Sequence, residues 1–202
     1  MTSITRINRP LAMHHKLAAL TLVLTTGLAF CASTWAQAPV ATHCKAGEFA
    51  YLNANMSKVQ PTQGGGYKLV KTDKVLSVCA DKQAEPFQML AYRYGPVGGV
   101  EMEQVARPEK PFSILTRSTS PHTGENLLFF TTGGFTYCVS EATGQGSGIG
   151  LTVTKSGKKI VDLFSGNERG VDFESEMIEI DFDVARSSVL KVAKSAPACD
   201  AP

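Results

Sequence analysis

The sequence predicts a mainly β fold, an antiparallel β-sandwich or open barrel built from hairpins. Three pairs of β-prone segments flank glycine-containing turns, at Gly95–Gly99, Gly133-Gly134 and Ser156-Gly157. Helical periodicity is scarce, and successive hairpins of this kind are typical of sandwiches and barrels. Residues 184–194 are either one short C-terminal helix or a last strand.

The β-prone segments follow one another along the chain. The first two are residues 66–72 and 74–80. Further along the chain, a Gly-Gly or Ser-Gly pair between two β-prone runs favours a tight hairpin loop. Residues 177–184 alternate strictly between apolar and acidic side chains, which predicts a half-buried strand. The three hairpins are predicted over 88–94 with 100–105, 125–132 with 135–141, and 150–155 with 158–164.

The stretch from Ala106 to Gly124 contains three X-Pro pairs, at Pro108, Pro111 and Pro121. Each proline biases the residue before it away from the helical conformation. We therefore expect a long surface connection here.

The N-terminus has the order of a secretory signal peptide. Arg6, Arg9 and Lys16 precede the apolar or small run 17–30, and further small residues follow. The run is short for a membrane span, which needs about 20 apolar residues.

We expect cleavage after Ala36, because Pro39 disfavours a cut after Ala38. Lipidation at Cys31 and an uncleaved anchor are less favoured alternatives. The sequence thus predicts a signal peptide at 1–36 and one domain at 37–202, with no membrane span after cleavage. It predicts a location in the periplasm of a Gram-negative cell or outside the cell.

Removal of the signal takes the formal charge from +2 to −1, because three basic residues and no acidic residue leave with it. A nearly neutral chain lacks the basic field of a nucleic-acid-binding protein. It also lacks the charge that holds a protein on anionic lipid.

Four cysteines remain after cleavage, and an even number in an exported chain indicates two disulfides. We favour Cys44–Cys79 with Cys138–Cys199, which fastens each half of the domain separately. The main rival is Cys79–Cys138 with Cys44–Cys199. No two cysteines have the close spacing of a zinc site, so no metal is predicted.

The glycine-rich stretch 144–150 contains the first candidate binding residues, Gly146, Ser147 and Gly148. A phosphate-binding loop requires a helix after it, and here a strand-like run follows. A nucleophile elbow requires glycine two residues before and after the serine, and neither is present. A flexible hairpin loop is the main interpretation, and a loop that enters a partner's cleft is the functional alternative.

The acidic stretch 168–183 includes Glu179, Asp181 and Asp183 on one face of the predicted strand. A solvated strand face is the main interpretation. The functional alternative is a surface that attracts a basic partner. Calcium binding is less favoured, because carboxylates at alternate strand positions line up rather than converge.

Tyr92 and Tyr94 share one face of their predicted strand, and Arg93 points the other way, towards Glu101 or Glu103 across the hairpin. An ordinary cross-strand pair beside core aromatics is the main interpretation. The functional alternative is an aromatic and arginine surface for a ligand or a protein.

No catalytic constellation is recognisable, and no cofactor is predicted. His122 lies in a polar loop close to Ser118 and Ser120. A hydrolase would need these groups to converge with an orienting carboxylate, which neighbours in one loop rarely achieve.

The segments 76–79, 90–95 and 100–103 (LSVC, LAYRYG and VEME) resemble a pattern in small exported proteobacterial proteins of unassigned role. The chain is also distantly similar to periplasmic lysozyme inhibitors, in its size, its export signal, its cysteines and Ser147-Gly148. Those inhibitors block an enzyme's cleft with a Ser/Gly-containing loop. Type VI immunity proteins are a related resemblance.

The export signal, the disulfide-fastened β scaffold, the glycine-rich loop and the acidic strand, without catalytic chemistry, favour a non-enzymatic protein that binds another protein, as an inhibitor or immunity factor against a toxin or cell-wall hydrolase. A small-ligand or glycan binder is the alternative, and an unrecognised hydrolase is third. The first predicts a protruding loop and the second a concave aromatic pocket.

Overall fold

The computed structural model describes residues 41–83, 86–120, 123–143, 148–166, 175–177 and 187–200. All of them lie in one compact unit, Ala38–Pro202. None of the helices within these ranges is long and apolar enough to cross a membrane.

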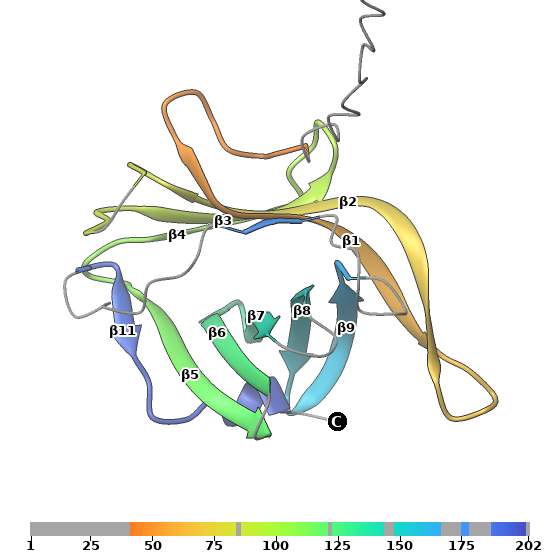
Figure 1. Cartoon of the computed structure of the whole chain (residues 1–202). Helices are drawn as coiled ribbons and strands as arrows, with labels where there is room; N and C mark the ends of the chain where they lie inside the picture. Colours follow the sequence, from red (N-terminus) through yellow and green to blue (C-terminus); the bar gives the residue numbers. More distant parts are fainter. Residues whose placement is uncertain are drawn as a thin grey trace, which may run out of the picture. The chain divides into compact units, whose positions relative to one another are not determined.

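The described ranges form a single sheet of eleven strands, folded over on itself (Figure 1). The strand order is β11-β5-β6-β7-β8-β9-β1-β2-β3-β4, and β10 also pairs with β1. The described pairs are antiparallel except β11 with β5, which is parallel. The strands are β1 (Phe49–Pro61), β2 (Tyr67–Ala80), β3 (Leu90–Pro96), β4 (Met102–Ala106), β5 (Phe112–Ser120), β6 (Thr123–Thr132), β7 (Phe135–Thr143), β8 (Gly148–Lys155), β9 (Lys158–Phe164), β10 (Ser175–Met177) and β11 (Leu190–Val192).

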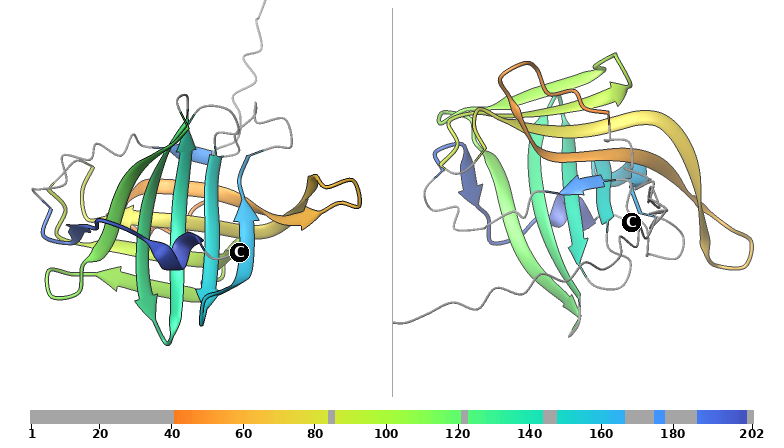
Figure 2. Two further views of the ribbon diagram at one scale, coloured as in Figure 1. Left: turned by 90° about the horizontal axis from the view of Figure 1, so that it is seen from below. Right: turned by 45° about the horizontal axis from the view of Figure 1, so that its top comes forward.

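The sheet has two halves that face each other across the core. Figure 2 shows that β1–β4 run across β5–β9 instead of along them. The pairing of β1 with β9 joins the halves at one side, through Ser57 with Phe164 and Lys58 with Leu163. The predicted antiparallel sandwich or open barrel is therefore confirmed.

Alternate residues of both halves point inwards and make one apolar core. An aromatic group lies within it: the ring of Phe130 packs on Phe112 and Tyr137, and Tyr92 meets Phe130 edge-on, with 5.1 Å between the ring centroids. The Tyr92 ring is fully buried, and burial raises the pKa of its hydroxyl well above the ordinary value. The other fully buried side chains include Met56, Leu76, Leu90, Ile149 and Leu151.

The three predicted hairpins are confirmed as β3–β4, β6–β7 and β8–β9. Gly133 and Gly134 both have positive φ in the β6–β7 turn, as a tight hairpin loop requires. Residues 66–72 and 74–80 are not two strands but one, β2. The first half of β2, up to Lys74, is exposed or half-buried, and Val75–Ala80 is buried.

The prediction of a long surface connection over 106–124 is wrong, because β5 occupies Phe112–Ser120. Pro111 and Pro121 flank this strand and do not interrupt it, so its N–H groups remain available for the ladder with β6. Phe112 and Ile114 alternate into the core. The connection is reduced to a tight turn, closed by the pairing of Arg107 with Lys110.

The described residues of 184–194 include β11, so a strand and not a helix occupies Leu190–Val192. The described residues after it include a 3-10 helix at Pro197–Asp200. Of the predicted strand 177–184, Met177 belongs to β10 and the rest lies outside the described residues.

Candidate functional site

A row of four polar residues crosses the outer face of β1–β4. Asn53 lies opposite Ser77, Ser77 opposite Arg93, and Arg93 opposite Glu103. Three of them are buried, with exposed fractions of 0% for Asn53 and Ser77 and 2% for Arg93. Polar side chains on the outer face of a sheet are buried only if something covers them.

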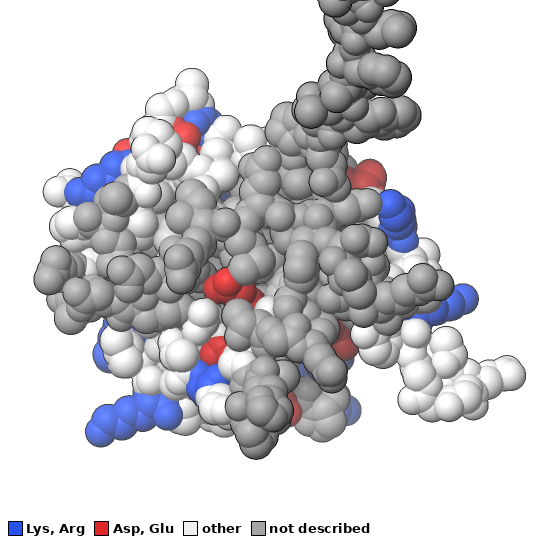
Figure 3. Space-filling model, viewed as in Figure 1, with Lys and Arg blue, Asp and Glu red and all other residues white. Residues whose placement is uncertain are grey.

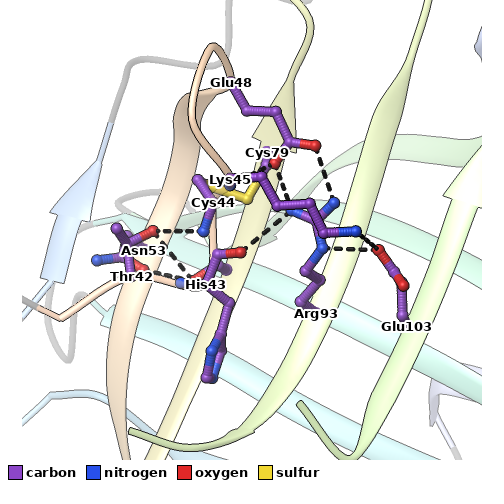
Figure 4. A network of polar contacts seen from close by, with 10 residues as sticks. Thr42, His43, Cys44, Lys45, Glu48, Asn53, Cys79, Arg93 and Glu103 are labelled. Atoms are coloured by element: carbon purple, nitrogen blue, oxygen red, sulfur yellow. Dashed lines mark hydrogen bonds and ion pairs between the residues drawn. A yellow bond between two sulfur atoms is a disulfide. The ribbon is translucent and has the colours of Figure 1, made fainter. Parts of the chain in front are cut away.

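The cover is the segment 41–48, called the strap below (Figure 4). The Cys44–Cys79 disulfide fastens the strap to β2, with 5.4 Å between the Cα atoms. The Asn53 side-chain amide donates to the Ala41 carbonyl at 2.9 Å, and the Ser77 hydroxyl donates to Asn53 Oδ1 at 2.6 Å. The strap thus supplies partners for the polar row that it buries.

Arg93 is the centre of the row. Its guanidinium forms a two-pronged ion pair with Glu48 of the strap, donates to Glu103 Oε1 at 2.8 Å, and donates to the His43 carbonyl at 3.2 Å. Lys45 also contacts Glu103, at 3.0 Å. Hydrogen bonds from Arg93 hold the pKa values of Glu48 and Glu103 below their usual range. The arrangement is a charge-assisted clamp on the strap.

Three groups in this clamp, Cys44, Glu48 and Cys79, offer possible metal-ligating atoms within 4.8 Å of one another. Both sulfurs are bonded to each other in the disulfide. Because the thiolate is the form that binds metals, the oxidised pair is not a ligand set.

The lowered carboxyl pKa values predict an acid-sensitive clamp. A carboxyl whose pKa is lower in the folded state stabilises the fold above its unfolded pKa, and this stability is lost as the pH falls through the folded value. We expect the free energy of unfolding to fall from about pH 4.5 downwards, in part through Glu48 and Glu103. Urea unfolding between pH 7 and pH 3 measures this.

The control is the variant Glu48→Gln/Glu103→Gln. It should be less stable than the wild type at pH 7 and should lose less stability on acidification. Parallel pH profiles for the two proteins would contradict the assignment.

A small pocket lies between the two halves of the sheet, lined by Tyr51, Leu52, Val78, Asn126, Leu128, Val139 and Glu141. The Asn126 side-chain amide donates to the buried Glu141 carboxylate at 3.2 Å. The pocket has room for about one water molecule, whereas sites for small organic ligands measure roughly 300–1,000 Å³. It does not have the size of a glycan site.

The outer part of the β1–β2 hairpin, residues 57–72 and called the arm below, has no buried residue. A register shift between Asn55 and Ser57 marks the bulge at which β1 leaves the barrel, and such bulges bend a strand. The Thr72 hydroxyl donates to the Met56 carbonyl at this bend. Figures 1 and 2 show the arm projecting beyond the body of the sheet.

The arm has two different faces. Lys58 lies opposite Val70 and Gln60 opposite Lys68, so these four side chains share one face. The other face carries Val59, Leu69, Pro61 and Tyr67. Tyr67 is 50% exposed and Val70 is 37% exposed, which leaves apolar surface in solvent on both faces.

The arm is also basic. Its sequence, SKVQPTQGGGYKLVKT, contains three lysines and no acidic residue. In the space-filling view its glycine-rich tip is white, with blue lysine or arginine side chains nearby (Figure 3). An apolar and basic projection with a tip poor in side chains is suited to contact an acidic protein surface.

The predicted residues Tyr92 and Tyr94 do share a strand face, but that face points into the core. Tyr92 is fully buried, and Tyr94 is half-buried with its pKa raised by desolvation to about 12. Arg93 points the other way and pairs with Glu103, one of the two predicted partners, but the strap covers it. The structure therefore leaves neither Tyr92 nor Arg93 at the surface to bind a ligand.

Gly148 begins β8, and a Cβ there would lie 2.5 Å from the ring of Phe164. A side chain at position 148 would therefore displace the Phe164 ring, and this glycine allows the ring to pack against the backbone. Gly146 and Ser147, like Glu179, Asp181 and Asp183, lie outside the described residues, so their binding roles stay predictions.

Ser118 and Ser120 belong to β5, and His122 lies outside the described residues. The serine–histidine alternative gains no support. Sequence reasoning missed the arm, although Gly64-Gly65-Gly66 between lysine-bearing β-prone runs was a usable signal.

The predicted disulfide pairing is confirmed: Cys44 is bonded to Cys79 and Cys138 to Cys199. The second disulfide fastens the C-terminal 3-10 helix to β7. An ion pair assists it, because Arg117 of β5 contacts both Glu125, at 2.8 Å, and Asp200, at 2.7 Å. Each end of the described domain is thus held by one disulfide and one arginine.

Comparison of the chain with known protein families, with curated proteins and with solved structures found no match.

Proposed function

We propose that this chain is an exported, non-enzymatic protein that binds another protein through the arm, as an inhibitor or immunity factor against a toxin or cell-wall hydrolase. The observation that carries the proposal is the arm itself. It projects from a rigid sheet, exposes Tyr67 and Val70, and carries lysines without acidic residues.

The scaffold suits this role. The arm continues strands whose inner halves are buried in the core, so its base is fixed and its docking costs little ordering entropy. The two disulfides are consistent with the oxidising compartment in which an exported inhibitor or immunity factor acts. Periplasmic location or secretion is part of the proposal.

The lysines on one face of the arm provide the test. We expect the charge reversal Lys58→Glu/Lys68→Glu to weaken partner binding by about tenfold or more, because like charges would then face an acidic surface. The mature protein is used to capture partners from periplasmic extract and from purified cell-wall hydrolases. Each retained protein is then purified and titrated by calorimetry.

The matched control is Lys191→Glu/Lys194→Glu, which reverses two exposed lysines away from the arm. A second variant replaces residues 59–69 by Asn-Gly, the preferred two-residue hairpin loop, and shortens the arm without touching the core. If no protein is retained at micromolar concentration, or if both arm variants bind as tightly as the control, the proposal is wrong.

A further inference from the structure

Among the described residues, no strand covers the outer edge of β9 next to the base of the arm. β9 pairs with β8 over most of its length, but it meets β1 only through Leu163 and Phe164. β1 turns away into the arm beyond Lys58, so residues 158–162 have no strand partner on that side within the described part of the chain. An open edge presents alternating backbone N–H and C=O groups to a further strand.

Two features of this edge oppose pairing with a second copy of the chain. The β8–β9 ladder shifts register between Val153 and Thr154, so Ile160 is an extra residue in a bulge. Lys158 and Lys159 are exposed beside it. Lysines on an edge strand repel the same edge of another copy, and bulges disrupt regular pairing.

The lysines of this edge favour an acidic strand instead. The turn end of the β8–β9 hairpin carries three lysines, Lys155, Lys158 and Lys159. At the other end of the β9 edge, Lys58 lies opposite Leu163. One acidic group, Asp162, contacts Lys159 at 3.2 Å and offsets part of the charge. Ile160 is 53% exposed and offers an apolar contact between the lysines.

We infer that the β9 edge accepts an extended acidic segment of the protein partner, which adds a strand to the sheet at the base of the arm. Main-chain hydrogen bonds provide the affinity in this mode of recognition, and side chains select the sequence. The inference rests on the proposed function, because the partner that grips the arm also supplies the segment.

The probe is the peptide acetyl-Glu-Val-Glu-Val-Glu-Val-amide, added to the isotope-labelled mature protein and followed by NMR. We expect it to shift the amide signals of residues 158–162 and to slow their hydrogen exchange. The same peptide with alternate N-methylated amides should bind about tenfold more weakly, because it lacks the edge donors. The lysine counterpart should not bind.

The variant Lys155→Glu/Lys158→Glu should lose binding of the acidic peptide, and Lys191→Glu/Lys194→Glu should retain it. Equal binding of the N-methylated peptide, or unchanged exchange at residues 158–162 at millimolar peptide, would overturn strand addition. The arm variants separate this failure from that of the proposed function. Suppose that the arm variants no longer bind a captured partner, and that this partner does not protect the β9 amides of the wild type from hydrogen exchange. Strand addition is then wrong, and binding through the arm stands.

Discussion

Replacing Arg93 by methionine should destabilise the domain by about 3 kcal/mol, the lower end of the range for removing one partner of a buried ion pair. The side chain of Arg93 is 2% exposed and that of Glu48 is 13% exposed. Without the guanidinium, the Glu48 carboxylate loses its ion pair and has little access to solvent, and the His43 carbonyl loses the hydrogen bond from Arg93. The midpoint of urea unfolding at pH 7 measures the loss.

Arg117, which also forms ion pairs in this domain, is the matched control. Arg117 also bridges two carboxylates, but its side chain is 32% exposed and that of Asp200 is 48% exposed. Solvated pairs contribute about 0–1 kcal/mol, so Arg117→Met should cost no more than about 1 kcal/mol. If the two variants lose equal stability, burial does not determine the strength of the clamp.

A third variant, Arg93→Lys, tests geometry. Lysine keeps the charge but cannot form the two-pronged pair with Glu48 while it also contacts Glu103. We expect it to recover only part of the lost stability. Full recovery would mean that charge alone, and not the planar fork of the guanidinium, holds the strap.

The hairpins were predictable because their signals are local. Gly133-Gly134 and Ser156-Gly157 each indicate a turn with two adjacent residues. The flanking strands can be predicted from their own sequence, without knowledge of a distant partner. β5 was missed because Pro111 and Pro121 outweighed the alternation of Phe112 and Ile114. Proline at a strand boundary and proline within a strand look alike until the ladder partner is known.

In the candidate site too, contacts within one hairpin were predictable and contacts between distant segments were not. The contact of Arg93 with Glu103 follows from the register of one hairpin, and the sequence narrowed the partner of Arg93 to Glu101 or Glu103. The contact with Glu48 joins residues 45 positions apart and requires the strap to fold back over the sheet. The arm depends on a bulge at Met56, and no local sequence pattern in β1 predicts this bulge.

Removing either disulfide should be the most damaging change to the described domain. In the chain-entropy model a crosslink stabilises by restricting the unfolded chain, and sequence separations of 35 and 61 residues correspond to about 4 kcal/mol for each bond. We therefore expect Cys44→Ala/Cys79→Ala and Cys138→Ala/Cys199→Ala each to lower the free energy of unfolding by that amount. Urea unfolding under oxidising conditions gives the values.

The two disulfide variants should differ in which part of the domain opens. Loop length alone makes the Cys138–Cys199 bond stronger by only about 0.5 kcal/mol, because loop entropy rises slowly with length. The strap has Arg93 as a buried second fastening, whereas the C-terminal segment has the more exposed Arg117. Hydrogen exchange should therefore show the C-terminal segment opening in its disulfide variant, while the strap stays protected in the other. A strap that opens as readily would mean that the disulfide, and not Arg93, keeps the polar row covered.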